Sequence, residues 1–215
     1  MEVFDNEVFK LNPNLTWETI DTPVAKITII EDFYEDFEAV HREMLKLPGA
    51  TTFCNTPGEI LDYRKSYGGN MEGTHAPYFL EYGDLVKSII GYEGPVHTQR
   101  QILVNCNILQ CDKYKDNWYN IHQDPVMDDS RDVISTVVML NQHYNEGEGT
   151  NFYYHDTPSS DMWYPKKLVQ RAHFVQGKPN RAILFSPYMY HGAAIGGDQY
   201  KSEYRYTQAI FTNLL

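Results

Sequence analysis

Basic residues are scarce in this chain, and their scarcity narrows the classes of partner. Lys and Arg together number 18 against 29 Asp and Glu, which leaves a formal net charge of -11 at pH 7. No Lys- and Arg-rich block interrupts this acidic background. Because binding along a nucleic acid backbone needs many cationic contacts, the composition disfavours nucleic acid as a partner.

Cysteines and long apolar runs are also scarce. The three cysteines, Cys54, Cys106 and Cys111, form no Cys-x-x-Cys pair, so we expect reduced thiols and a cytoplasmic location. No stretch approaches the ~20 apolar residues of a membrane span, and residues 1–20 lack the basic start and apolar run of a signal peptide. We therefore expect no membrane partner, and nothing in the sequence indicates an oligomeric state.

Several common catalytic motifs are missing as well. The chain contains no HExxH, no GxSxG, no P-loop and no GxGxxG, so no motif supports zinc proteolysis, serine hydrolysis or common nucleotide binding. The clustered His-x-His ligands expected of a cupin-like binding barrel are absent too.

What is present favours one globular domain over residues 1–215. Apolar residues make up 42% of the chain and aromatic residues 14%, enough to build a core of ordinary size. The region before residue 96 predicts mixed α/β support, with a strand at 24–30 and helices at 35–47 and 77–90. The stretch 48–77 is dense in Gly, Pro, Asn and Thr; it is either a lid or a surface excursion packed by its own aromatic residues.

From residue 96 onward the pattern changes to short β-like runs separated by turn signals. The runs lie at 100–110, 132–141, 150–155, 168–175, 181–186 and 203–215, with weaker ones at 115–122 and 191–196. Eight short strands in this span predict a sandwich or barrel.

His122 and Asp124 follow one of the weaker runs. On an extended backbone, residues two apart point to the same side, so both side chains could reach one ion. With eight histidines and 29 acids a His-x-acid pair arises by chance on the order of once. His41 and Glu43 form such a pair in a predicted helix, where the side chains diverge, and we interpret His41 as a solvated surface residue. The alternative for His122 and Asp124 is a polar turn.

Two later residues add to this pair. His191 follows a strand-like run and a Pro turn, and Arg205 lies inside the last apolar strand. A cation in a buried strand needs an anionic partner, because an unpaired interior charge costs several kcal/mol. The alternatives are a hydrogen-bonded core histidine and a structural ion pair with one of the many acids.

The order of a strand, His-x-Asp, several strands, a His after a turn and an Arg on the last strand resembles the iron(II) and 2-oxoglutarate-dependent dioxygenases. The resemblance covers about residues 96–215. It implies a double-stranded β-helix (a jelly roll, or cupin-like barrel) with N-terminal helices packed on one sheet. It also implies that His122, Asp124 and His191 bind Fe(II), in the two-histidine, one-carboxylate arrangement of non-haem iron oxygenases.

The resemblance further implies that Arg205 binds the distal carboxylate of 2-oxoglutarate, with Thr207 as a second contact. Family members often place a Tyr upstream of the His-x-Asp pair on the same ligand, and Tyr114 and Tyr119 are the two matches. Tyr119 and the glycine-bearing run at 139–152 are loosely similar to the prolyl 4-hydroxylase branch.

The resulting expectation is hydroxylation with Fe(II), 2-oxoglutarate and O2, with ascorbate as reductant and succinate and CO2 as products. A peptide or protein side chain and a small metabolite both fit as substrate. Two alternatives stay open: a non-catalytic metal-binding β-barrel module, and a nucleic acid demethylase of the same superfamily, which the net charge disfavours.

Overall fold

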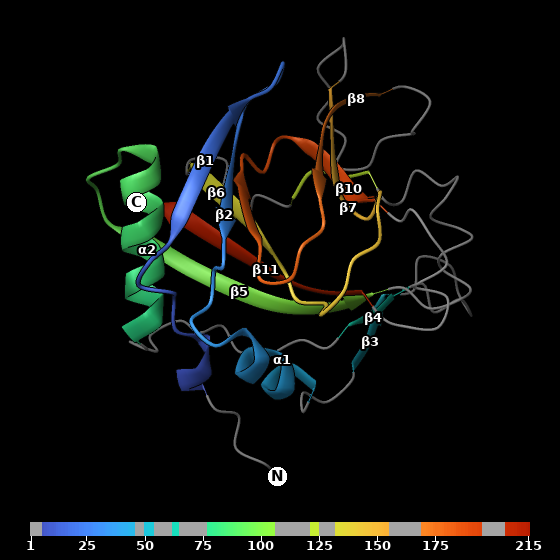
Figure 1. Ribbon diagram of the computed structural model, residues 1–215. Coiled ribbons are helices and arrows are strands. Elements are labelled where there is room, and N and C mark those ends of the chain that lie inside the picture. Colours follow the sequence, from blue (N-terminus) through green and yellow to red (C-terminus); the bar gives the residue numbers. More distant parts are fainter. Residues whose placement is uncertain are drawn as a thin grey trace.

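The architecture is mostly β, with antiparallel sheets and few helices, and is consistent with a cupin-like fold (Figure 1). The structure is a computed structural model that describes residues 6–45, 50–53, 62–64, 77–105, 121–124, 132–154, 169–194 and 205–215. Its helices are η1 (Asn6–Phe9), α1 (Phe37–Leu45) and α2 (Pro77–Ile90).

The strands form three antiparallel sheets. They are β1 (Thr16–Asp21), β2 (Lys26–Glu31), β3 (Ala50–Phe53), β4 (Asp62–Arg64), β5 (Val96–Asn105), β6 (Val133–Met139), β7 (Gly149–Tyr154), β8 (Gln170–Gln176), β9 (Ala182–Phe185), β10 (Tyr190–Ala194) and β11 (Arg205–Leu214). A six-stranded sheet has the order β1-β2-β9-β6-β11-β5, and a three-stranded sheet has the order β10-β7-β8. The remaining pair is β3-β4.

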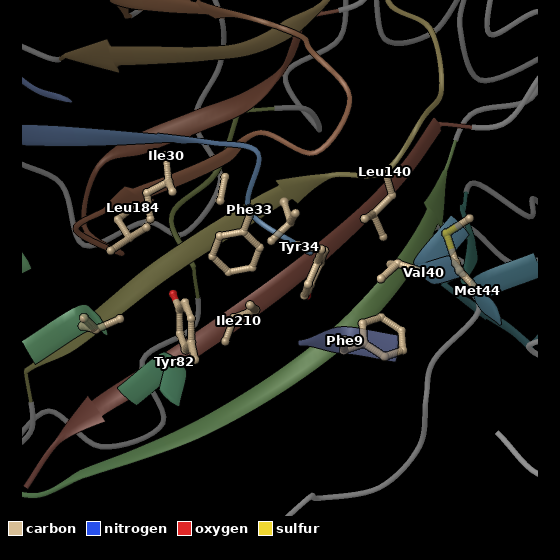
Figure 2. Close-up of a cluster of buried hydrophobic side chains, with 13 residues drawn as sticks. Phe9, Ile30, Phe33, Tyr34, Val40, Met44, Tyr82, Leu140, Leu184 and Ile210 are labelled. Atoms are coloured by element: carbon tan, nitrogen blue, oxygen red, sulfur yellow. The ribbon is translucent and has the colours of Figure 1, made fainter. Parts of the chain in front are cut away.

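The six-stranded sheet is apolar on both faces because its central strands, such as β9 with the sequence AILF, are buried on both sides. On one face it packs against η1, α1 and α2 through a cluster drawn in Figure 2, where Tyr82 of α2 and Met44 of α1 lie over Ile210 and Leu140. Phe33 and Tyr34 stack edge to face within this cluster, with ring centroids 4.8 Å apart. The three helices therefore pack on the face of β11 that carries Ile210.

The opposite face of the six-stranded sheet packs against the three-stranded sheet. Met139 and Phe185 from the larger sheet share a buried core with Phe152 of β7 and Val175 of β8. Side chains alternate along a strand, so Arg205 and Thr207 point into this space between the sheets while Ile210 points toward the helices. Figure 1 shows the same two-layer arrangement.

Two sequence expectations about this region change with the structure. His41 is not a solvated surface residue: it is half-buried, and its Nδ1 lies 2.8 Å from the carbonyl oxygen of Leu140. The stretch 48–77 contains the short paired strands β3 and β4, and its other residues before α2 lie outside the described part of the chain. The question of a lid therefore stays a prediction.

Candidate metal centre

The chain brings His122 and His191 together by backbone pairing. His122 N–H donates to the His191 carbonyl and His191 N–H donates to the His122 carbonyl, both at 2.9 Å, in an isolated antiparallel bridge. Residues that exchange both hydrogen bonds lie directly opposite one another, with side chains on the same side. The two imidazole rings accordingly have centroids 4.4 Å apart.

The two residues after His122 are also hydrogen-bonded to the segment that precedes β10. Asp124 N–H donates to the Pro187 carbonyl at 3.1 Å, and Gln123 Nε2 donates to the Tyr188 carbonyl at 2.6 Å. Asp124 lies two positions beyond His122, so its side chain returns to the same side as the imidazole. Segment 121–124 is therefore held along the turn that leads into β10.

Three ligand atoms converge as a result. The Asp124 Oδ1 atom lies 3.9 Å from His122 Nε2 and 3.7 Å from His191 Nε2, and the ligand atoms of the three residues all lie within 4.8 Å of one another. An ion about 2.1 Å from each donor joins donors up to roughly 4 Å apart. Both distances from Asp124 Oδ1 to the imidazole nitrogens lie within that limit. Two imidazoles and one carboxylate fit a non-haem Fe(II) centre in donor chemistry.

The contacts of His191 set the tautomer and the orientation of its imidazole so that Nε2 is available as a metal ligand. Its Nδ1 lies 2.9 Å from the Met189 carbonyl oxygen, which can only accept, so Nδ1 carries the proton and Nε2 keeps its lone pair. His191 as a whole is 4% exposed, and its imidazole packs against the Phe185 ring at a centroid distance of 4.6 Å. This packing fixes the ring orientation.

Arg205 lies at the start of β11, on the interior face. It is 6% exposed, and its only hydrogen bond within the described residues runs from Nη2 to the Gly149 carbonyl at a long 3.4 Å. Among the described residues, its Nε atom has no hydrogen-bond partner and no carboxylate pairs with the guanidinium. The structural ion pair that would explain this arginine is thus not found in the described part of the chain, and the guanidinium fits an anionic ligand.

Arg205 and the metal triad, which is the name used below for His122, Asp124 and His191, lie beside opposite ends of a short stretch of β7. Arg205 contacts Gly149, whereas His191 is paired with Phe152. Three residues along a strand span about 10 Å. Thr207, predicted as a second contact, is 2% exposed and lies on the same strand face as Arg205. Tyr114 and Tyr119 lie outside the described residues.

Tyr144 is a neighbour of Arg205 that the sequence interpretation missed. Burial raises the pKa of Tyr144 to about 12, although the positive charge of Arg205 and a hydrogen bond with Asn141 oppose the rise. The Asn141 N–H donates to the Tyr144 hydroxyl at 3.2 Å, and Asn141 Oδ1 accepts from the Tyr206 N–H at 2.8 Å. Asn141 thereby ties the turn after β6 to the beginning of β11, and no short motif signals such a contact.

Comparison with known proteins gives structural neighbours alone. No family model matches the chain, and no curated protein sequence matches it. The epimerase SnoN, in complex with Fe3+, alpha ketoglutarate and nogalamycin RO, aligns over 82% of this chain and 72% of its own with a TM-score of 0.51 and 12% identity. AviO1 from Streptomyces viridochromogenes Tue57 aligns over 99% and 96% with a TM-score of 0.50 and 12% identity. The chain shares their fold.

The described helices carry no membrane-spanning segment. None of them is both long enough and apolar enough to cross a bilayer.

Proposed function

We propose that the chain is an Fe(II)- and 2-oxoglutarate-dependent oxygenase that hydroxylates a peptide or protein side chain or a small metabolite. The observation that carries the proposal is the convergence of His122, Asp124 and His191 about 10 Å along β7 from a buried arginine that has no acidic partner in the described chain. Neither feature alone is specific, but together they match a ligand bound at one end by a metal and at the other by a cation.

The fold in this proposal is a single domain whose residues 96–215 form a double-stranded β-helix. Its support is the way consecutive strands change sheet: β6 lies in the larger sheet, β7 and β8 in the smaller, β9 in the larger, β10 in the smaller and β11 in the larger. Jelly rolls are built from two sheets with such crossings. The region before residue 96 then braces the larger sheet through η1, α1 and α2.

The roles of the residues follow from their positions. His122, Asp124 and His191 would hold Fe(II), and bound iron with 2-oxoglutarate would supply an oxidant made from O2, with release of succinate and CO2. The Met189 carbonyl keeps the His191 proton on Nδ1. Phe185 and Phe152 cover the imidazole of His191 and keep water from that side.

Arg205 would neutralise and orient the distal carboxylate of 2-oxoglutarate, because a guanidinium can form two parallel hydrogen bonds with a carboxylate. Thr207 would add a hydroxyl contact, and Tyr114 or Tyr119 would supply a further one. We also retain ascorbate as reductant and the cytoplasm as location as parts of this proposal, from the family resemblance and the cysteine content.

The test is metal binding followed by turnover. The purified protein is expected to bind one Mn(II) or Fe(II), and His122→Ala or His191→Ala is expected to remove most of that affinity, because each deletes one of three donors. His143→Ala, at an exposed position, is the matched control and is expected to bind normally. Isothermal titration measures the affinity; undiminished binding in both triad variants would overturn the metal assignment.

Turnover separates the enzyme from a binding module. With Fe(II), ascorbate and O2, the wild-type protein is expected to convert 2-oxoglutarate to succinate slowly even without its true substrate. Metal binding with no succinate, across a range of candidate substrates, would instead support a non-catalytic metal-binding module.

A further inference from the structure

The chain just after β6 is hydrogen-bonded to α1 on the helical side of the larger sheet. His41 of α1 donates from Nδ1 to the Leu140 carbonyl at 2.8 Å, because a carbonyl oxygen can only accept. One turn earlier on the helix, Glu38 accepts a hydrogen bond from Gln142 Nε2 at 2.9 Å. Leu140 is also buried with Val40 in the core on this side (Figure 2). The segment that leaves β6 is therefore bound to the helix at two positions.

The same segment holds the start of β11. Leu140 N–H donates to the Tyr206 carbonyl at 3.1 Å, and Tyr206 N–H donates to Asn141 Oδ1 at 2.8 Å. The regular pairing of β11 with β6 begins one residue later, at Thr207 opposite Met139. Both backbone polar groups of Tyr206 are thus bound by residues 140 and 141, and these two residues fix where β11 begins beside β6.

Tyr206 connects this attachment to Arg205. The Tyr206 ring meets the His41 imidazole edge to face, with centroids 6.0 Å apart. Side chains alternate along a strand, so Arg205, the preceding residue, projects from the opposite face into the space between the sheets. Among the described strands Arg205 is paired with β5 alone, so its position relative to β6 depends on Tyr206. A movement of Tyr206 would move the guanidinium with it.

We propose that His41 is a positioning residue for Arg205: by binding the Leu140 carbonyl and packing on the Tyr206 ring, it aims the guanidinium from the far side of the larger sheet. The inference rests on the function proposed above. A binding group works only while it is held within about 0.5 Å of its productive geometry. Loosening the His41 attachment therefore weakens recognition of the distal carboxylate and leaves the metal triad, which lies on the other side of the sheet, intact.

The experiment compares two ligands of the same carbon chain length on the Mn(II)-loaded protein. 2-Oxoglutarate carries the distal carboxylate and 2-oxopentanoate lacks it, and isothermal titration gives the affinity for each. His41→Phe keeps an aromatic ring beside Tyr206 but removes the N–H donor. It is expected to weaken 2-oxoglutarate binding about fivefold, the size of effect typical of one lost hydrogen bond, while leaving 2-oxopentanoate and Mn(II) binding unchanged.

Two further variants on α1 complete the comparison. His41→Asn is the rescue variant, because its amide nitrogen stands as many bonds from the backbone as the imidazole Nδ1 and can donate to the same carbonyl. It is expected to recover most of the affinity for 2-oxoglutarate. Arg42→Ala, at an exposed position next to His41, is the matched control and is expected to bind both ligands as the wild-type protein does.

A double-mutant cycle separates positioning from a general effect on the fold. If His41 acts through Arg205, His41→Phe is expected to cause no further loss of 2-oxoglutarate affinity in the Arg205→Ala protein. If His41→Phe loses its native circular dichroism, His41→Ala takes its place in the cycle.

Three results would overturn the role of His41 while the proposed function stands. They are unchanged 2-oxoglutarate affinity in the folded His41 variant, an equal loss for both ligands, and a loss in the Arg205→Ala background as large as in the wild-type background. Failure of the wild-type protein to bind 2-oxoglutarate at all would overturn both proposals.

Discussion

Arg205 carries a charge where water hardly reaches, because only 6% of the residue is exposed. If its guanidinium pairs with the distal carboxylate, Arg205→Ala leaves that carboxylate unpaired, at a cost of about 2–5 kcal/mol. We expect 2-oxoglutarate to bind the Mn(II)-loaded variant roughly 30-fold or more weakly, with Mn(II) affinity unchanged. Isothermal titration measures both affinities.

Arg205→Lys is the matched variant and is expected to recover part of the loss, since an ammonium keeps the charge but not the two-pronged contact. Equal 2-oxoglutarate affinity in wild type and Arg205→Ala would show that the arginine serves the fold.

At the scale of residues, the sequence predicted part of the grouping of His122, Asp124 and His191 that the structure shows, and little of their surroundings. The two-residue spacing of His122 and Asp124 already placed both on one side of an extended backbone. The approach of His191 depends on pairing between segments nearly 70 positions apart, and local pattern holds no information about it. The same reason explains why His41 was misjudged, since its partner is the Leu140 carbonyl of a distant strand end.

Strand β7 begins at a glycine whose conformation other residues rarely adopt. Gly149 has φ +155°, and a Cβ there would lie 2.1 Å from the Val175 carbonyl oxygen of β8. Because that atom is backbone, Gly149→Ala forces the two strands apart, and we expect a loss of about 2–4 kcal/mol in the free energy of unfolding. Urea denaturation measures it.

Gly91→Ala is the matched control for this change. Gly91 also has a positive φ, +69°, but a Cβ there would meet nothing within 4 Å. Gly91→Ala is therefore expected to lower the free energy of unfolding only by the cost of a positive φ at alanine, about 1 kcal/mol. A loss for Gly149→Ala no larger than that for Gly91→Ala would contradict the close approach of β7 and β8.

At the scale of elements, strong periodicity was a reliable guide. The helix predicted at 77–90 is confirmed as α2, because its apolar spacing and Pro start need no distant partner. Strand β1 was missed because nearly all of its side chains are exposed, so no alternation marks it, and it is defined by pairing with β2. Strand β5 begins four residues before the predicted start at 100, since pairing with β11 fixes its extent.

For the molecule as a whole, the count of short strands and turns after residue 96 correctly predicted a mainly β chain with facing sheets. The strand count holds no information about what covers the other face of the larger sheet, which only the family resemblance addressed, because that core gathers residues from η1, α1 and α2 as well as the sheet. Tyr82 belongs to the core on the helical side of the larger sheet, and Tyr144 packs against the core between the two sheets. Their hydroxyls link the stability of the fold to pH.

Burial raises the pKa of Tyr144 from its usual 10 to about 12, and burial also raises the pKa of Tyr82. A raised pKa means that the folded protein holds the phenolic proton more tightly than the unfolded chain does. The resulting stability is fully present below pH 10 and is lost as pH rises from 10 through about 12, because the unfolded state then releases its proton first. For Tyr144 the difference corresponds to about 3 kcal/mol.

Urea unfolding midpoints measured from pH 8 to 11.5 are therefore expected to be flat up to about pH 9.5 and then to fall. Tyr144→Phe and Tyr82→Phe each remove one of the protons that cause the fall, so each variant is expected to lose less stability across this range than wild type, even if it starts from a lower value. Tyr188→Phe, whose side chain is 53% exposed, is the control for the general repulsion of an acidic chain at high pH. If all three variants lost stability in parallel with wild type, the fall would come from net charge, and the buried tyrosines would have no share in it.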